Sequence, residues 1–377
     1  MNYQNIFITG STGYLGIHLL NDFLVNTEAK IYCLIRKKKD MLTEEYLNEM
    51  LSFYFDESYF NKYKARIQIV EGDLSSDNFG LSLEEYDLLG KSCDLIIHSG
   101  AFVKSLGKYS ELEDVNVIGT EKVIKLAEDY DIPLAHISTL SVAGRYTFNK
   151  ERTLFTEEDF DIGQEFNKSI YTRSKCEAEK RVFKAKEKGL KVGIFRIGLL
   201  VARMKDGLFP KNINQNFFYN RIKDVINLRC IDEDSLTCDQ EFTPVDLCSL
   251  AIFKILNNTT NLEGVYHISN LKYKNIGELV EYLQNEEDIN IKVLNAEEFE
   301  KYRNNLLATE DIKNIPLDLL VARARKVEVI ERESYPIIIS SDKTEAYMKE
   351  IGFEWPEIDK EYLHKVMNYL RKIKYIN

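Results

Sequence analysis

Three evenly spaced glycines near the amino terminus constrain the fold of this chain more than any other feature. Gly10, Gly13 and Gly16 follow the apolar run at residues 6–8, and an apolar helical pattern begins at Tyr14. This order predicts a strand, a tight turn and a helix that opens at the turn. Backbone N–H groups in such a turn, together with the positive end of the helix dipole, bind a pyrophosphate. The segment therefore predicts a dinucleotide-binding site.

The spacing of these glycines leaves a second interpretation open. It is G-x-x-G-x-x-G, whereas simple dehydrogenases carry G-x-G-x-x-G, and short glycine motifs also occur in ordinary turns. The position of the turn, at the first strand-to-helix junction of the chain, favours the cofactor site because a Rossmann fold places its phosphate-binding turn there.

Short apolar runs alternate with helix-length amphipathic segments along the chain. Strands are predicted at residues 6–9, 31–35, 67–70, 95–98, 134–137, 192–195 and 265–268, with helices such as 120–129 and 174–188 between them. Strands separated by helices form βαβ units and a parallel sheet that is buried on both faces. The predicted fold class is therefore α/β, a Rossmann-type doubly wound parallel sheet with a smaller, mostly helical C-terminal substrate domain.

The alternation weakens after residue 195, and this change sets the predicted domain boundaries. Residues 207–239 read as irregular and aromatic, whereas a helix at 241–256 and a strand at 265–268 resume the earlier pattern. From Lys272 onward the chain is more charged and mostly helical. We therefore expect a nucleotide-binding Rossmann domain at 1–200, to which 241–270 return, and a C-terminal substrate-binding subdomain formed by 201–240 and 271–377.

Charge and composition exclude several classes of protein. The 377-residue chain carries a formal net charge of −11, whereas a nucleic-acid-binding protein needs a basic face. No apolar run reaches the length of about 18 residues that a membrane span needs. The six cysteines form no C-x-x-C pair and the five histidines no H-x-x-x-H grouping. We therefore expect reduced thiols, no metal site and a cytoplasmic protein.

A tyrosine four residues before a lysine on a helix places both side chains on one face. There the ammonium can lower the pKa of the phenol and hold a nicotinamide ribose. Three pairs have this spacing, Tyr146/Lys150, Tyr171/Lys175 and Tyr219/Lys223, and chance pairs are expected among 22 tyrosines. Position favours Tyr171 and Lys175, because Tyr171 follows a loop and opens the helical stretch YTRSKCEAEKRVF. We expect Tyr146, in a loop, and Tyr219, in the irregular segment, to be surface phenols.

Hydroxyl groups gather at the end of the predicted strand 134–137, where Ser138, Thr139 and Ser141 follow one another. Ligands bind in the crevice outside the carboxyl ends of parallel strands. One of these hydroxyls, with Thr139 first, is therefore predicted to hydrogen-bond a substrate oxygen. The alternative is a hydroxyl that caps the following turn.

Basic residues follow the second predicted strand, in the sequence RKKK at 36–39. An acid at this strand end binds the ribose 2′-hydroxyl of NAD, whereas a basic residue accommodates the 2′-phosphate of NADP. Arg36 is the first candidate because its planar guanidinium suits a phosphate, and a solvated charge run is the alternative. Asp73 and Leu74 after the third strand, and Ser99 and Ala101 after the fourth, are predicted to line the same cofactor.

Eight motifs occur in order over residues 6–270: FITGSTGYLG, CLIR, EGDLSS, DLIIHSGAFV, DVNVIGT, HISTLSV, YTRSK and EFTPVD. Together they resemble the extended short-chain dehydrogenase/reductase group. More specifically, they resemble the thioester reductase domains that terminate non-ribosomal peptide synthetases and carboxylic acid reductases. Sugar-nucleotide epimerases share the glycine turn and the Tyr/Lys pair, but HSGAFV, NVIGT and STLSV favour the thioester reductases.

The resemblance implies a catalytic set and a cofactor site at defined positions. The family's Thr-Tyr-Lys set falls on Thr139, Tyr171 and Lys175, and its NADP-selecting arginine falls on Arg36. The family's usual asparagine is Ser99 here, and the residue after the motif's lysine, often tryptophan, is Cys176. The implied cofactor is NADPH, and its predicted contacts are Gly10, Thr12, Gly13, Tyr14, Leu15, Gly16, Arg36, Asp73, Leu74, Ser99, Ala101, Tyr171, Lys175 and Ile197.

The reaction that the resemblance implies is the NADPH-dependent release of an acyl or peptidyl chain as an aldehyde. A second round would give an alcohol, and the sequence leaves open whether it takes place. The chain would arrive as a thioester on the phosphopantetheine arm of a carrier protein, which the C-terminal subdomain is expected to bind. Tyr171 and Thr139 would donate hydrogen bonds to the carbonyl oxygen, where charge develops. Tyr171 would supply the proton as general acid, and Lys175 would hold the ribose.

Two other functions are compatible with the same motifs. An NAD(P)-dependent sugar-nucleotide epimerase or dehydratase would keep a bound NAD, and Arg36 in place of an acid disfavours it. A nucleotide-sensing regulator would keep the fold without catalysis, and the intact set of Thr139, Tyr171 and Lys175 disfavours that interpretation.

Overall fold

The computed structural model describes residues 3–103, 107–144, 146–147, 154–167, 169–210, 212–309, 334–335 and 337–376. The chain divides into two compact units. Unit 1 consists of Met1–Leu200, Val245–Ser269 and Ser334–Glu354, and unit 2 of Val201–Pro244, Asn270–Glu333 and Trp355–Asn377. The sequence predicts that all of 271–377 belongs to the C-terminal subdomain. The segment Ser334–Glu354 instead belongs to unit 1.

Unit 1 is built on a seven-stranded sheet in the order β13-β8-β5-β4-β1-β2-β3. All of its strand pairs are parallel, which confirms the predicted α/β doubly wound fold. The strands are β1 (Asn5–Thr9), β2 (Lys30–Ile35), β3 (Ile67–Glu71), β4 (Leu95–His98), β5 (Leu134–Thr139), β8 (Val192–Ile197) and β13 (Val265–Ile268). The strand order reverses between β1 and β4, so the ligand crevice of such a sheet opens where these two strands end.

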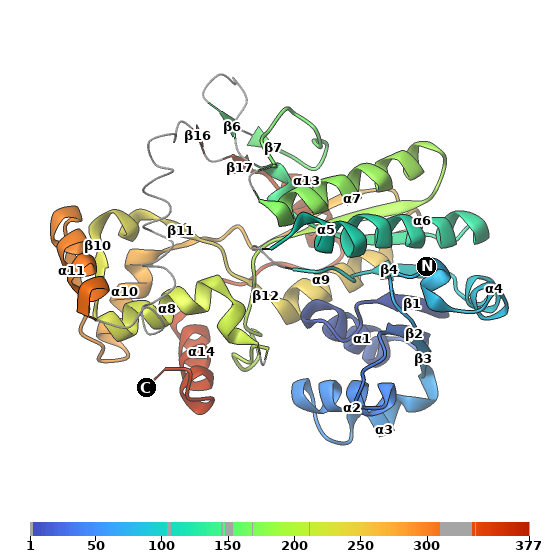
Figure 1. Ribbon diagram of the computed structural model, residues 1–377, viewed down its shortest axis with the longest axis horizontal. Helices are drawn as coiled ribbons and strands as arrows, with labels where there is room; N and C mark the ends of the chain where they lie inside the picture. The colour runs from blue at the N-terminus through green and yellow to red at the C-terminus, as the bar shows by residue number, and fades with distance from the viewer. Residues whose placement is uncertain are drawn as a thin grey trace. The chain divides into compact units, whose positions relative to one another are not determined.

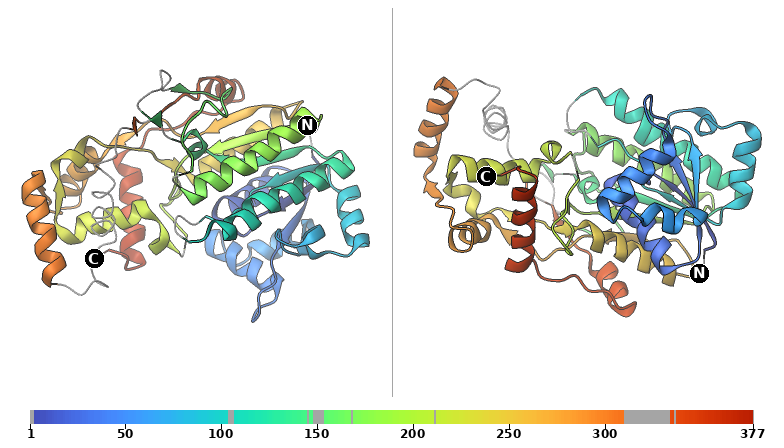
Figure 2. Two further views of the ribbon diagram at one scale, coloured as in Figure 1. Left: turned by 45° about the horizontal axis from the view of Figure 1, so that its top comes forward. Right: turned by 90° about the horizontal axis from the view of Figure 1, so that it is seen from below.

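Apolar strands covered by helices on both faces form the core of unit 1. Ile6, Phe7 and Ile8 of β1 are completely buried. Helices α6 and α7 lie side by side on one face of the sheet, and α1 and α9 lie together on the other (Figures 1 and 2). The helices of this unit are α1 (Tyr14–Asn26), α2 (Thr43–Tyr54), α3 (Tyr59–Tyr63), α4 (Leu83–Ser92), α5 (Tyr109–Leu112), α6 (Gly119–Tyr130), α7 (Ile170–Glu187), α9 (Val245–Asn258) and α13 (Asp342–Glu350).

The segment Ser334–Glu354 joins unit 1 through backbone pairing and side-chain contacts. Strand β16 (Ser334–Tyr335) pairs with β6 (Tyr146–Thr147), and β17 (Ile338–Ile339) pairs with β7 (Leu154–Phe155). Thr344 of α13 accepts a hydrogen bond from the backbone N–H of His267 on β13 at 2.9 Å. These partners lie roughly 70 to 200 residues away in the sequence, and pairing at such separation leaves no local pattern.

Unit 2 is mostly helical. Among its described residues, the helices are α8 (Phe217–Leu228), α10 (Ile276–Asn285), α11 (Ala296–Thr309) and α14 (Lys360–Lys372), and the short strands include β10 (Cys230–Asp232), β11 (Asp239–Gln240), β12 (Thr243–Pro244), β14 (Lys274–Asn275) and β15 (Lys292–Leu294). Strand β9 (Leu200–Val201) lies at the boundary between the units. Among the described residues, no helix is both long and apolar enough to cross a membrane.

The prediction that residues 207–239 are irregular is wrong, because α8 lies within them. Asn216 caps this helix by accepting a hydrogen bond from the backbone N–H of Tyr219 at 3.1 Å. Phe218 and Ile226 are buried on one face of it. Aromatic and β-branched residues have low helix propensity, and packing of an amphipathic face stabilises such a helix instead.

A half-buried carboxyl group lies between α1 and α9. Asp22 of α1 accepts a hydrogen bond from the Ser249 hydroxyl of α9 at 2.5 Å. Burial raises the pKa of Asp22 to about 7, the nearby charge of Asp246 adds to this, and hydrogen bonds from Ser249 and Asn21 oppose it. Because the unfolded chain releases this proton first as the pH rises, the free energy of unfolding falls between the ordinary pKa of 3.8 and about 7.

We expect the substitution Asp22→Asn to raise the melting temperature by a few degrees above neutral pH and to flatten the pH dependence below it. Asparagine is nearly isosteric, still accepts from Ser249 and needs no buried charge. Thermal unfolding of both proteins across this pH range measures the effect. A variant that is less stable than the parent protein at every pH would contradict the assignment.

Candidate active site

The predicted glycine turn is formed by close backbone packing at the ends of β1 and β4. Gly10 has a φ of +72°, and a Cβ built on it would lie 2.7 Å from the backbone of Gly100. A Cβ on Gly16 would lie 2.0 Å from the carbonyl oxygen of Gly10. Both positions therefore require glycine, because a methyl group has no room there.

The first turn of α1 carries a site suited to an anion. Gly13 is the N-cap residue and offers no side chain to the free N–H groups, and the first turn contains no acidic residue. The Leu15 side chain is buried in the core, so a cofactor would reach Leu15 through its backbone alone. Thr12 and Tyr14 of the same turn are half-buried. A backbone cradle that a Cβ would fill, next to an uncapped helix start, fits the pyrophosphate of a dinucleotide.

The loop after β4 is joined to β1 by a residue that the sequence argument missed. The Thr9 hydroxyl accepts a hydrogen bond from the Gly100 backbone N–H at 3.1 Å and lies 2.7 Å from Nδ1 of buried His98. A Cβ on Gly100 would lie 2.6 Å from Cδ1 of Leu74. Leu74 and Ser99 are half-buried beside the turn, and Ala101 is exposed. The structure thus brings the predicted cofactor residues after β1, β3 and β4 to one edge of the sheet.

Arg36 and Asp73 meet at the ends of β2 and β3. The Arg36 guanidinium lies 4.0 Å from the Asp73 carboxylate, and its side chain is 68% exposed. Burial acts to raise the pKa of Asp73, but hydrogen bonds from Ser75 and the charges of Arg36 and Lys122 hold it below its ordinary value. The guanidinium is therefore accessible to a phosphate, and its position beside Asp73 is defined by an ion pair that costs little to rearrange.

The structure brings together Thr139 and Tyr171, which come from β5 and α7. The Thr139 hydroxyl lies close enough to the Tyr171 phenol to lower its pKa. The N-cap hydroxyl of Ser169 accepts from the Thr172 backbone N–H at 3.3 Å and so starts α7 just before Tyr171. Ile197 of β8 lies opposite Thr139 in the sheet register. Two hydroxyl groups therefore lie next to each other at the carboxyl edge of the central strands.

Lys175 lies one helical turn after Tyr171 on α7 and points toward the same strand. Its ammonium donates a hydrogen bond to the backbone carbonyl oxygen of Ile137 at 2.8 Å. Burial lowers the pKa of Lys175 to about 8, although the charge of Glu179 opposes this. A lysine with such a pKa changes its charge near physiological pH.

The pKa of Tyr171 departs from the sequence-based expectation. The sequence predicts that Lys175 lowers it, but burial raises the pKa of Tyr171 to about 12, and the nearby Thr139 hydroxyl opposes this shift only in part. The phenol therefore keeps its proton at neutral pH and is able to donate it.

The other hydroxyls near β5 take different positions. Ser138 is buried and donates a hydrogen bond to Glu179 at 2.5 Å, on the helix-facing side of the strand. Ser141 is exposed, and its backbone N–H donates to the Thr139 hydroxyl at 3.2 Å. The Thr139 hydroxyl thus caps the turn that follows β5, as the alternative interpretation expects, and it also lies beside Tyr171. The predicted hydrogen bond from Thr139 to a substrate oxygen stays a prediction.

The remaining Tyr/Lys pairs lie elsewhere. Tyr219 is buried in unit 2, where its hydroxyl accepts a hydrogen bond from the Ala202 backbone N–H at 2.8 Å, so it is a core residue rather than a surface phenol. Lys223 of the same helix lies 4.5 Å from the ring centre of Tyr375. The side chain of Tyr146 and all of Lys150 lie outside the described residues.

Asn116 joins the predicted site to the loop after β4 and was not singled out from the sequence. It lies in a π-helical segment, Glu113–Ile118, of a kind that often marks functional sites. Its amide bonds the Phe102 backbone N–H at 2.7 Å and the Ser174 hydroxyl at 2.9 Å. Ser174 in turn donates to the Tyr171 carbonyl oxygen at 2.8 Å. The asparagine of the motif DVNVIGT was the available signal, because a buried amide needs several partners.

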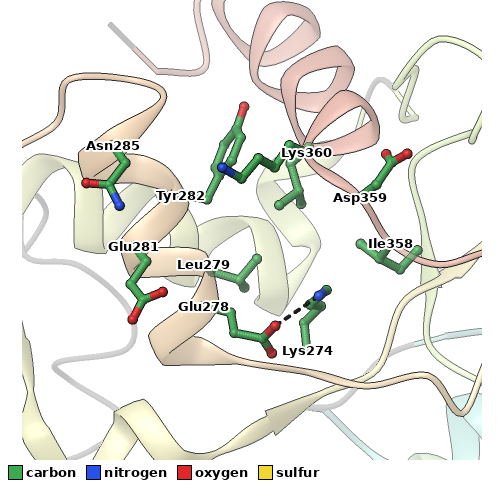
Figure 3. A pocket seen from close by; sticks show the side chains of 10 residues that line it. Lys274, Glu278, Leu279, Glu281, Tyr282, Asn285, Ile358, Asp359 and Lys360 are labelled. Atoms are coloured by element: carbon green, nitrogen blue, oxygen red, sulfur yellow. Dashed lines mark hydrogen bonds and ion pairs between the residues drawn. The ribbon is translucent and has the colours of Figure 1, made fainter.

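A pocket of about 320 Å³ lies within unit 2 and is lined by α10 and the start of α14 (Figure 3). Its charged side chains are largely paired, as in the ion pair of Lys274 with Glu278 at 2.9 Å, and that of Lys360 with Glu286 at 2.5 Å. None of the predicted catalytic or cofactor residues lines it. Its geometry therefore offers no support to the chemistry predicted for unit 1.

Sequence comparison identifies relatives of this chain. The model of an NAD-binding protein family described as "Male sterility protein" matches residues 8–252. A linear gramicidin synthase from Brevibacillus parabrevis is 28% identical over 377 residues, which cover 98% of this chain and 7% of that protein. The chain therefore spans a small part of this much longer relative.

Structural comparison distinguishes two of the functions considered from the sequence. A thiolation-reductase di-domain from an archaeal non-ribosomal peptide synthetase has a TM-score of 0.86 and 29% identity, with 99% of this chain and 76% of that chain covered. A UDP-glucuronic acid 4-epimerase from Bacillus cereus, solved with NAD, has a TM-score of 0.62 and 14% identity, with 98% and 97% covered. The similarity to the epimerase shows the fold alone. The TM-score and the sequence identity are both higher for the reductase.

Proposed function

The chain belongs to the NAD-binding family described as "Male sterility protein", and on that premise we propose that it is an NADPH-dependent thioester reductase. Its substrate would be an acyl or peptidyl chain bound as a thioester to the phosphopantetheine arm of a carrier protein, and its product an aldehyde. The similarity to a thiolation-reductase di-domain supports both the reaction and the carrier as partner. The family and the fold by themselves support a more general assignment, namely an oxidoreductase that binds a dinucleotide.

The observation that carries this proposal is the placement of the Thr139 hydroxyl beside the Tyr171 phenol, with Lys175 one helical turn further along α7 and bonded to the same strand as Thr139. Two hydroxyl donors at one strand end can both point at an oxygen that gains negative charge, and such donors supply much of the rate enhancement in acyl chemistry. Burial holds the Tyr171 phenol in its protonated form. A carbonyl oxygen bound there would therefore receive a proton as it becomes an alkoxide.

Each residue of the set has its own part in the reaction. NADPH, when bound at the glycine turn, supplies the hydride. Tyr171 and Thr139 orient the thioester carbonyl, and Tyr171 transfers its phenolic proton to the oxygen. The resulting hemithioacetal then loses the carrier thiol and leaves an aldehyde. Lys175, in its ammonium form, holds the ribose and stabilises the phenolate that remains on Tyr171.

NADPH, rather than NADH, is proposed as the cofactor because the accessible guanidinium of Arg36 lies at the end of β2. We expect Arg36→Ala to weaken NADPH binding by roughly 10- to 100-fold, the value of a charge-assisted contact with a phosphate. NADH binding should change little, because NADH has no 2′-phosphate. Fluorescence titration with both cofactors measures the difference.

A matched control is available for Arg36→Ala in the neighbouring residue. Lys37 pairs with Glu71 at 3.6 Å and is 80% exposed, so Lys37→Ala removes the same charge from the same loop. We expect it to have a smaller effect on NADPH. Equal weakening of NADPH and NADH by Arg36→Ala would show that this side chain does not recognise the 2′-phosphate.

Product analysis with a loaded carrier protein tests the proposed reaction as a whole. A carrier that bears a simple acyl thioester is incubated with the protein and NADPH, and aldehyde, free carrier thiol and oxidised cofactor are quantified together. We expect the three to form in equal amounts during the first round. Free acid without cofactor oxidation would show hydrolysis instead. Conversion of a sugar nucleotide without net cofactor oxidation would identify an epimerase.

A further inference from the structure

A completely buried ion pair lies behind the candidate active site. Glu179 of α7 and Arg196 of β8 have no exposed side-chain surface, and their charged atoms are 2.5 Å apart. The Arg196 Nε also donates to Glu179 at 2.9 Å. Burying two charges is costly, and replacing such a pair by apolar side chains is often neutral or stabilising. Stability is therefore a weak explanation for this pair.

Glu179 contacts both elements that carry the proposed catalytic groups. It lies one helical turn after Lys175 on the same face of α7, so the two side chains are neighbours. Its second carboxylate oxygen accepts a hydrogen bond from Ser138 at 2.5 Å. Ser138 immediately precedes Thr139 on β5. A single carboxylate thus faces the lysine and holds the strand end that presents the threonine.

The far side of the ion pair is held by the segment that returns to unit 1. Arg196 Nη1 donates to Nε2 of His267 at 3.2 Å, so Nδ1 of that ring donates to the Ser340 carbonyl oxygen at 2.7 Å. Burial and the adjacent Arg196 charge lower the pKa of His267 to about 4, which keeps the ring neutral. Arg196 therefore has a neutral imidazole on one side and the Glu179 carboxylate on the other, and Glu179 balances its positive charge.

The other titratable groups around Lys175 are uncharged near neutral pH. Burial raises the pKa of Tyr171 and of Cys176 on α7 to about 12. Burial and the Lys175 charge lower the pKa of His136 on β5 far below its ordinary value, and that of His98 on β4 to about 3. Among the described groups whose negative charge raises the pKa of Lys175, Glu179 has the largest effect, and it forms the ion pair with Arg196.

From this arrangement we infer that Glu179 is a positioning residue for the proposed reaction: its carboxylate keeps Lys175 in the ammonium form and, through Ser138, orients the strand end that carries Thr139. This inference rests on the proposed function. Glu179 has no exposed side-chain surface, so it would act on the reaction only through Lys175 and Ser138, by maintaining the positive charge of the Lys175 ammonium. Arg196 and His267 complete the support by fixing the carboxylate.

The test is the pH profile of the Glu179→Gln variant. Glutamine keeps the shape but removes the charge. Its oxygen can still accept from Arg196, and its NH2 group can donate to the Ser138 hydroxyl in place of the bond that the carboxylate accepts. We expect the alkaline limb of kcat to move to lower pH by roughly 1 to 3 units, the effect of a close opposite charge on a lysine. The matched control is Glu157→Gln, because Glu157 is also buried and accepts from the Thr344 backbone N–H at 2.9 Å at the opposite end of the network. Its alkaline limb should stay in place.

A double variant covers the case in which Glu179→Gln fails to fold around an unpaired Arg196. Glu179→Gln combined with Arg196→Met leaves no uncompensated buried charge. It should show a downward shift of the alkaline limb that is smaller than that of Glu179→Gln, because Lys175 has lost its carboxylate but the opposing charge of Arg196 is removed as well. A wild-type alkaline limb in any folded variant without the Glu179 charge would overturn the inference.

Unfolding of the cofactor-free protein gives a readout that does not depend on activity. Folding lowers the pKa of Lys175 from 10.5 to about 8. The free energy of unfolding is therefore reduced at pH values below about 8, and it increases as the pH rises from about 8 to 10.5. Without the Glu179 charge, the pKa of Lys175 is lower and this increase begins at a lower pH. The difference in free energy of unfolding between the wild-type protein and Glu179→Gln, its stability deficit, should therefore shrink as the pH rises toward 8. The deficit of Glu157→Gln should stay constant over that range.

The two readouts separate failure of this inference from failure of the proposed function. If the wild-type protein forms aldehyde and Glu179→Gln scales the rate equally at every pH, with a constant stability deficit, Glu179 is merely structural. If the wild-type protein forms no aldehyde, the proposed function fails, and the unfolding profiles alone decide whether Glu179 controls the charge of Lys175.

Discussion

The substitution Tyr171→Phe is expected to lower turnover by roughly 10²- to 10⁴-fold, the usual contribution of a general acid, while NADPH binding stays nearly intact. Phenylalanine preserves the ring and its packing but has no proton to donate, while Thr139 keeps its hydrogen bond from the Ser141 backbone N–H. Single-turnover reduction of a carrier-bound thioester and a separate titration with NADPH measure the two effects. Near-normal turnover would remove Tyr171 from the mechanism.

Tyr219→Phe is the matched control for this experiment. Tyr219 also precedes a lysine by four residues. It is buried, and its hydroxyl accepts a hydrogen bond from the Ala202 backbone N–H at 2.8 Å. Its loss leaves a buried N–H without that partner, which costs about 1 to 3 kcal/mol of stability. We therefore expect a lower melting temperature with turnover preserved, so that a general effect of removing a buried phenol can be distinguished from loss of the acid.

The second large effect is expected from Gly16→Ala at the glycine turn. The added methyl group would lie 2.0 Å from the Gly10 carbonyl oxygen, so the backbone of the turn must move. Overpacking of this kind costs about 1 to 3 kcal/mol of stability, and the displaced N–H groups lose their alignment with the pyrophosphate. We expect NADPH binding to weaken by roughly 10-fold or more. Calorimetric titration of the folded variant measures it.

Gly13→Ala provides the graded comparison for Gly16→Ala. Its Cβ would lie 3.1 Å from the same carbonyl oxygen, a contact that a shift of a few tenths of an ångström relieves. We expect a smaller loss of NADPH affinity and of stability than at Gly16. If both variants bound NADPH as the parent protein does, the turn would not be the pyrophosphate site.

Much of the fold could be predicted from local patterns. Each of the seven sheet strands is a short apolar run, and such a run is visible in the sequence because both faces of a parallel sheet are buried. Helix α8 was not predicted from local patterns, because its aromatic residues form a stable helix only when one face of that helix is packed. The return of Ser334–Glu354 to unit 1 was not predicted either, because strands of two residues are too short to show a periodic pattern.

The candidate site was predictable where spacing along the chain determines geometry. Glycines separated by three residues, and a tyrosine four residues before a lysine, define a turn and a helix face without reference to the rest of the molecule. The tertiary structure decided everything that depends on residues distant in sequence: the contact of Thr139 with Tyr171, the contact of Glu179 with Ser138 and Arg196, and the link from Asn116 to Phe102. It also decided the pKa values of Tyr171 and Lys175, because burial is a property of packing among several elements and cannot be deduced from one segment.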